Sequence, residues 1–292
     1  MPTLDDLKKR IKSVKSTQKI TKAMKMVAAA KLRKAQENAE KGRPYSQKMQ
    51  NIVLNLTKSF NDPENAPKLM IGTGEDKIYL CIVLTADRGL CGGFNSNICR
   101  LAKNNFKKLL SEGKKLEIIT VGSKGLDQIK REYGKYIIKN ISFKEKKVIS
   151  FNEAEIVGKE IIDLFNKKEF DKCVLFYSNF KNVITQIPQM QQIIPAGKIE
   201  LTDNKEEGIS YEFEPDEDEI LEDLLPKNIS TQVFKAFLEN AASEQGSRMT
   251  AMDNATRNAG DLVDKLTINY NRSRQASITK ELIEIISGAE SL

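Results

Sequence analysis

The chain has 292 residues, of which 40% are hydrophobic, 30% are charged and 7% are aromatic. It contains no His, which removes the commonest general base and metal ligand and so weakens any enzymatic interpretation. The formal net charge of +7 is uneven, because residues 1–60 contain fifteen Lys and Arg against four acidic residues, a local +11. Such asymmetry indicates different partners along the chain.

The N-terminal segment, residues 1–60, has the pattern of a coiled-coil helix. Leu4, Leu7, Ile11 and Val14 recur at spacings of three, four and three, which is typical of a left-handed coiled-coil seam. Pro44 removes a backbone donor and predicts a kink or break in this helix. The predicted stripe continues through Met24, Val27, Ala28, Leu32, Ala35 and Ala39, and beyond Pro44 through Tyr45, Met49, Ile52, Val53 and Leu56.

No signal segment opens the chain, and no apolar run approaches membrane-spanning length. We therefore expect a cytoplasmic protein that does not itself insert into a membrane.

Residues 61–67 are predicted to be a linker, and residues 68–196 an α/β domain of Rossmann-like type. Apolar, β-branched runs predict buried strands, and the segments between them predict helices, so the sheet should be mostly parallel with four to six strands. Ser150 and Glu153 form a predicted capping box at one helix start. Strands are predicted at 78–84, 116–121, 136–141 and 173–180, with 183–187 and 192–194 as a hairpin or edge extension.

The C-terminal segment, residues 211–292, predicts a second long helix. Eight acidic residues lie between 212 and 223, and no Pro follows Pro226. About sixty helical residues would span roughly 90 Å, too long to fold back into a globular core. Its predicted stripe comprises Ile220, Leu224, Val233, Phe237, Ala241, Met249, Met252, Ala255, Ala259, Leu262, Leu266, Tyr270, Ile278, Leu282 and Ile285.

Two helical arms with narrow apolar stripes must pair to bury them, so we expect a long antiparallel two-helix coiled coil forming one discontinuous domain. Ala28, Ala29 and Ala30 are predicted to oppose Ala251, Ala255 and Ala259. The polar C-terminal tip, residues 270–282, predicts contacts with another chain, and an exposed helix held by its own charge pairs is the alternative.

The four cysteines are predicted to be ordinary buried thiols. Cys81, Cys91, Cys99 and Cys173 form no CxxC pair, so their spacing suggests neither a zinc site nor a disulfide framework.

Two further patterns keep alternative functions open. The glycine-rich loop at residues 87–95 lies between a predicted strand and a helix, but it is neither GxGxxG nor a P-loop, so a tight turn is favoured over a dinucleotide-dependent enzyme. The basic N-terminal helix lacks interleaved aromatics, which favours a solvated face or an acidic protein collar. A nucleic-acid-associated coiled-coil structural protein remains the alternative.

Four motifs resemble those of one family: IKSVKSTQKITKAMKMVAAAKL at 11–32, DRGLCGGFN at 87–95, EQGSRMTAM at 244–252 and YNRSRQASITKEL at 270–282. With them the chain resembles the gamma subunit of the F-type ATP synthase over essentially its full length. Members of that family in plant plastids carry a cysteine-bearing insertion, whereas residues 196–225 contain no Cys here, so thiol regulation is not expected.

The resemblance implies a non-catalytic rotor that couples proton flow to ATP synthesis or hydrolysis by rotation, without catalytic, cofactor-binding or metal-binding residues. The implied partners are the alpha and beta subunits of the catalytic hexamer, the epsilon subunit and the proteolipid c ring, with no nucleic acid. The implied location is peripheral, at the cytoplasmic face of the bacterial inner membrane. Matching motif positions give Met24, Lys25, Arg248, Gln275, Thr279 and Glu281 as contacts with the hexamer, and Tyr211 and Glu214 as contacts with the proteolipid ring and epsilon.

Overall fold

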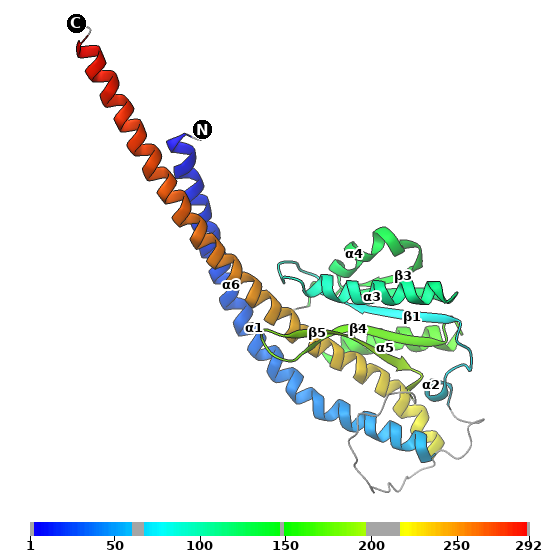
Figure 1. The fold of residues 1–292 in the computed structure, drawn as a ribbon. Coiled ribbons are helices and arrows are strands. Elements are labelled where there is room, and N and C mark those ends of the chain that lie inside the picture. Colours follow the sequence, from blue (N-terminus) through cyan, green and yellow to red (C-terminus); the bar gives the residue numbers. More distant parts are fainter. Residues whose placement is uncertain (1–2, 60–66, 147–148, 197–216, 291–292) are drawn as a thin grey trace. The chain divides into compact units, whose positions relative to one another are not determined.

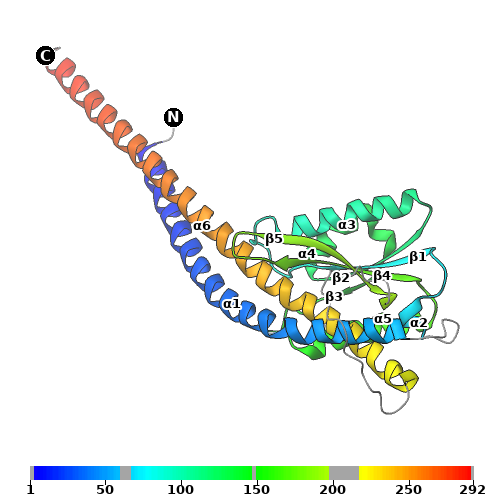
Figure 2. The same ribbon diagram turned by 60° about the horizontal axis from the view of Figure 1, so that its bottom comes forward.

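The computed structural model describes residues 3–59, 67–146, 149–196 and 217–290 (Figures 1 and 2). The chain forms two compact units, one from Met1–Ala30 with Arg248–Leu292 and one from Lys31–Ser247. We call them the helical unit and the α/β unit. The division into domains at 1–60, 68–196 and 211–292 remains a prediction.

Two long helices, α1 (Leu4–Ser59) and α6 (Glu217–Glu290), confirm the predicted helical arms. Of the predicted kink or break at Pro44, the break is wrong, because Pro44 lies inside α1, and the kink remains a prediction. Pro226 likewise lies inside α6. An interior proline costs about 3 kcal/mol. Packing on either side outweighs that cost, since Ser46 and Leu225 are almost completely buried.

The α/β unit holds a five-stranded sheet in the order β3-β2-β1-β4-β5. Strands β1 (Ile78–Leu84), β2 (Lys115–Val121), β3 (Ile137–Ile141) and β4 (Lys172–Phe180) are parallel. The edge strand β5 (Gln186–Ile194) is antiparallel to β4, so the predicted pair at 183–187 and 192–194 is one strand. The mostly parallel sheet is confirmed.

Helices cover both faces of this sheet (Figure 1). On one face α3 (Phe94–Ser111) and α4 (Ser123–Tyr133) pack on a core that includes Phe106, Ile118 and Phe176. On the other face α5 (Phe151–Asn166) and part of α6 bury Val157, Ile161 and Val233 among others. Short helices α2 (Lys68–Ile71) and η1 (Gly134–Tyr136) complete the unit.

The expectation that the second long helix stays out of any core is therefore wrong for residues 228–243. Nearly every residue there is buried, including the polar Asn228, Gln232, Glu239 and Asn240. The apolar pattern predicted that only one side of this helix would be buried, but here α6 is surrounded by protein on all sides. Its polar side chains must therefore form hydrogen bonds inside the protein. None of the described helices combines the length and apolar character needed to cross a membrane.

The four cysteines are free and buried, as predicted. The glycine-rich loop is a turn in which Leu90 and Gly92 have φ of 62° and 57°. Asp87 holds this turn by accepting hydrogen bonds from Ser123 N at 2.9 Å and Ser123 Oγ at 2.7 Å. Its other bonds are from Ser142 Oγ at 2.8 Å and Phe143 N at 3.3 Å.

The predicted capping box at the start of α5 is confirmed. Ser150 N and Ser150 Oγ donate to Glu153 Oε2 at 2.8 and 2.5 Å. These hydrogen bonds, helped by Lys146, lower the pKa of Glu153 from 4.5 to about 2. The carboxylate is therefore more stable in the folded than in the unfolded chain.

Replacing Glu153 with Gln should lower the thermal unfolding midpoint by a few degrees at pH 7 but not near pH 2. A folded pKa below the unfolded value gives stabilisation that is fully present above pH 4.5 and is lost as the pH falls toward 2. Unfolding curves of wild type and variant between pH 2 and 7 check this. Glu155→Gln on the same helix is the control, and a midpoint difference that persists at pH 2 would contradict the assignment.

Candidate partner-binding surface

In the helical unit, one face of α1 is a regular seam. Its buried and half-buried positions alternate at spacings of three and four through residues 4, 7, 11, 14, 18, 21, 25 and 28. This confirms the first four predicted positions and adds Gln18, Thr21 and Lys25, which the apolar pattern missed. The assignment of Val27 to the seam is wrong, because its side chain is 57% exposed.

The matching seam of α6 runs through Met252, Val263 and Leu266, all buried. The sequence pattern chose Leu262 instead of Val263, but Leu262 is 40% exposed. Both errors arise because apolar character does not distinguish adjacent positions: Val27 was placed on the stripe beside Ala28, and Leu262 in place of Val263. A heptad allows only one of them on the seam.

Polar contacts fix the register of the two helices. Lys25 Nζ lies 2.5 Å from Asp253 Oδ1, and Thr256 Oγ1 donates to Thr21 Oγ1 at 2.8 Å. A Cβ on Gly260 would lie 3.0 Å from Gln18 Nε2, so the helices approach closely there. This antiparallel register places Gln18 and Thr21 opposite residues 256–260. The predicted contacts of Ala28 to Ala30 with Ala255 and Ala259 are therefore wrong, and the one with Ala251 remains a prediction.

The contact residues taken from the resemblance fall into two groups in this unit. Met24, Lys25 and Arg248 belong to its middle and are half-buried, whereas Gln275, Thr279 and Glu281 belong to the end of α6 and are exposed. At ~1.5 Å per residue, the groups at Asp253 and Gln275 are about 33 Å apart along the helix. Tyr211 and Glu214 lie outside the described residues.

Two of these side chains already have partners within the unit. Lys25 is paired with Asp253, and this contact lowers the pKa of Asp253. Thr279 Oγ1 donates to the backbone oxygen of Gln275 at 2.9 Å. Asp253 was missed by sequence reasoning, and an acid opposite a basic seam position is the signal that could have found it.

The tip of α6 exposes a large apolar surface. Every residue from 278 to 289 is exposed, in contrast to the seam before it. Large apolar side chains that are half or more exposed are Ile278, Leu282, Ile283, Ile285 and Ile286 at this tip, with Ile20, Met26, Val27 and Ile268 elsewhere in the unit. Contiguous exposed apolar groups of this kind mark interaction surfaces.

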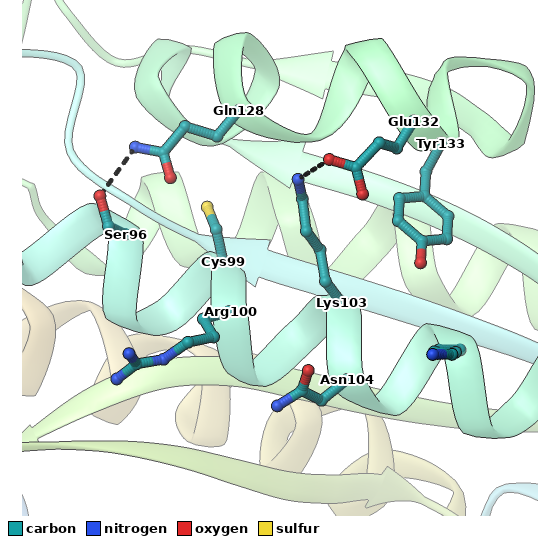
Figure 3. A pocket seen from close by; sticks show the side chains of 9 residues that line it. Ser96, Cys99, Arg100, Lys103, Asn104, Gln128, Glu132 and Tyr133 are labelled. Atoms are coloured by element: carbon teal, nitrogen blue, oxygen red, sulfur yellow. Dashed lines mark hydrogen bonds and ion pairs between the residues drawn. The ribbon is translucent and has the colours of Figure 1, made fainter.

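Described residues of the α/β unit line hollows of similar size at two places. One, of about 340 Å³, lies between α3 and α4, where Lys103 Nζ pairs with Glu132 Oε1 at 2.6 Å and Gln128 Nε2 donates to Ser96 Oγ at 3.4 Å (Figure 3). The other, of about 360 Å³, is mostly apolar and is lined by Gly42, Tyr45, Ser46, Phe151, Thr231, Phe234, Lys235 and Leu238. Burial lowers the pKa of Lys235.

Comparison with known proteins gives this surface its context. Residues 3–292 match the family described as ATP synthase. The ATP synthase gamma chain of Pelagibacter ubique (strain HTCC1062) is 73% identical over 292 residues, with both chains covered completely. The chain belongs to the gamma-subunit family of the F-type ATP synthases. The gamma chain of Rhizobium leguminosarum bv. trifolii (strain WSM2304) is 58% identical, again over the full length of both chains.

Solved structures agree with this gamma subunit assignment. A chain of the Tetrahymena thermophila mitochondrial ATP synthase central stalk and c-ring structure is 27% identical, with a TM-score of 0.59 over 81% of this chain and 99% of that one. A chain of the Euglena gracilis mitochondrial ATP synthase shares the fold at 20% identity, with a TM-score of 0.65 over 99% and 94%.

The gamma subunit is thus the rotor subunit of an F-type ATP synthase and part of its central stalk, assembled with other subunits of that complex. The nucleic-acid-associated alternative finds no support in these relatives. The contacts at Met24, Lys25, Arg248, Gln275, Thr279 and Glu281 remain predictions.

Proposed function

We propose that this gamma subunit is a non-catalytic shaft that couples proton flow to ATP synthesis or hydrolysis by turning inside a hexamer of alpha and beta subunits. The exposed apolar tip of α6 carries the proposal. Ile278, Leu282 and Ile285 are 50, 54 and 69% exposed, and the described residues of the helical unit do not cover them. An apolar sleeve formed by other chains would bury this surface.

The coupling follows from symmetry. A single two-helix shaft is asymmetric and cannot make equivalent contacts with three identical beta subunits, so each catalytic site experiences a different contact energy. Differences in contact energy shift three equivalent sites into different nucleotide-binding states. Rotation then passes each site through all three states in turn.

The hexamer contacts are assigned to the two groups described above. In the middle group, Arg248 and Met24 are half-buried in the helical unit, and Lys25 takes part through a charge that Asp253 already orients. In the tip group, Gln275 and Glu281 are exposed and can meet a partner directly. Contacts between the shaft and the hexamer must break and form again at every step of rotation. Several weak polar contacts suit this better than one residue that contributes most of the binding energy.

The other partners are assigned to the α/β unit. Tyr211 and Glu214 are the candidate contacts with the proteolipid c ring and epsilon. Bound in this way, the subunit is peripheral at the cytoplasmic face of the inner membrane and takes part in hydrogen ion transport through its partners.

The combined substitution Gln275→Ala and Thr279→Val should reduce ATP-driven proton pumping per ATP hydrolysed by about twofold or more, because it removes polar contacts at the tip. Both side chains are exposed, so the unfolding of the isolated chain should not change. Pumping and hydrolysis are measured in membrane vesicles that contain the whole complex.

A control and a broader test complete this experiment. Lys265→Gln changes an exposed charge in the helical unit that lies outside both contact groups and should leave the ratio unchanged. If the tip variant pumps as well as wild type, specific contacts at Gln275 and Thr279 are excluded. If a tagged chain copurifies with neither alpha nor beta subunits, the shaft proposal itself fails.

A further inference from the structure

Arg43 and Glu239 form a two-pronged ion pair that joins α1 to α6 inside the α/β unit. Arg43 Nε donates to Glu239 Oε1 at 2.6 Å, and Arg43 Nη2 donates to Glu239 Oε2 at 3.0 Å. The Glu239 side chain is 3% exposed and that of Arg43 is 36% exposed. Paired N–H donors on one carboxylate fix both distance and angle, which a single contact does not.

The same two side chains hold the end of β4. Phe180 N donates to Glu239 Oε2 at 3.0 Å, and Arg43 Nη2 also donates to Phe180 O at 2.9 Å. From the next residue of α6 and from one turn further on, Asn240 Oδ1 accepts a hydrogen bond from Ser178 N and Ser243 Oγ donates to Ser178 O, each at 3.0 Å. Three elements far apart in sequence therefore meet in one network of directional bonds.

Strand pairing explains why this end of β4 is open to α6. The β1 strand pairs with β4 only as far as Phe176, so the backbone of Ser178 and Phe180 has no β1 partner. On the other side Ser178 faces Pro188 of β5, which has no N–H to donate. Side chains of α6 supply the partners that a neighbouring strand would supply elsewhere.

The helices also approach each other closely at this level. A Cβ on Gly42 would lie 2.8 Å from Leu238 Cδ1, so a larger residue at 42 would require the Leu238 side chain to shift. Ser46, one turn on, is buried and donates to Arg43 O at 2.9 Å. The ion pair therefore lies within a tightly packed contact between α1 and α6.

We propose that Arg43 and Glu239 form a torque clamp, which fixes the angle of the two shaft helices about their axes relative to the sheet. Apolar packing around Val233 and Phe237 is non-directional and permits a helix to slip about its axis, whereas charge-assisted hydrogen bonds to the end of β4 do not. Arg43 and Glu239 are positioning residues. The proposal deepens, and rests on, the function of the chain as a rotating shaft.

The test compares the whole complex carrying Glu239→Gln or Arg43→Lys with wild type. Either change keeps most of the volume but removes the two-pronged charged contact. We expect ATP hydrolysis to stay within about twofold of wild type, while protons pumped per ATP against an opposing gradient fall at least threefold. The loss should grow as the gradient is raised, because a loosened clamp slips under load.

Asp171→Asn is the matched control. Asp171 is also a buried carboxylate that accepts backbone hydrogen bonds, from Lys77 N and Ile78 N at 2.9 Å, but its partners lie at the start of β1 and not on a long helix. It should lower the unfolding midpoint without changing pumping per ATP. An equal loss of pumping in Asp171→Asn, or none in both clamp variants, would overturn the clamp.

Failure to fold does not leave the clamp untested. If Glu239→Gln does not assemble, Arg43→Lys, which keeps a cation beside Glu239, tests the clamp through the same measurement of protons pumped per ATP. If wild type itself does not couple hydrolysis to pumping, the shaft function fails rather than the clamp.

Discussion

Replacing Gly122 with Ala is expected to destabilise the α/β unit by about 3 to 5 kcal/mol, a large part of the stability of an ordinary domain. Gly122 has φ of 101°, which an L side chain rarely adopts. An added Cβ would also press on the backbone oxygen of Thr85 and lie 2.8 Å from Thr85 Oγ1. The backbone oxygen belongs to the turn after β1 and cannot move aside as a side-chain end can.

Two other glycines separate the causes of this loss. Gly113 has φ of 73° but nothing within 4 Å of an added Cβ, so Gly113→Ala reports the backbone strain alone, about 1 to 2 kcal/mol. Gly89 has neither feature, and Gly89→Ala should be close to neutral. Urea unfolding of the three variants measures the order. Equal losses in Gly122→Ala and Gly113→Ala would show that contact with Thr85 plays no part.

The second large effect is expected in the helical unit. Leu266→Asp places a charge at a seam position that is 7% exposed and removes a buried side chain, a cost of at least about 3 kcal/mol. The two helices should separate within the helical unit, because there each helix buries only this narrow stripe. Circular dichroism should show lost helix, and trypsin should cut faster within residues 1–30 and 248–292.

Ile268→Asp makes the same chemical change two residues away, where the side chain is 67% exposed. The isolated chain should keep its helix content and protease resistance. In the complex, however, a charge on this outer apolar position should weaken assembly with the alpha and beta subunits if partners cover that face. Loss of helix content in both variants alike would contradict the described seam.

Particular residues show how far sequence reasoning reached. The strand at Ile78–Leu84 and the capping box at Ser150 were predicted correctly because local apolar runs and local hydrogen bonds determine them. Val27 and Leu262 were misplaced because apolar character does not distinguish adjacent positions of a helix. The polar pattern of residues 270–282 predicted contacts with another chain, but the choice of Gln275 and Thr279 within it came from the resemblance and remains a prediction.

The sequence by itself determined two long helices, a mostly parallel sheet between them and membership of the rotor family, since these depend on local pattern and on motifs that can be read in order. Only the tertiary structure decided the register at Lys25 and Asp253, the burial of residues 228–243 and the meeting of Arg43 with Glu239 and Phe180. These pairs are separated by 228 or 196 positions, or lie on different elements. Their contacts depend on the packing of the whole unit. A buried charge or an unpaired strand end must form hydrogen bonds, and the tertiary fold decides which groups are near enough to form them.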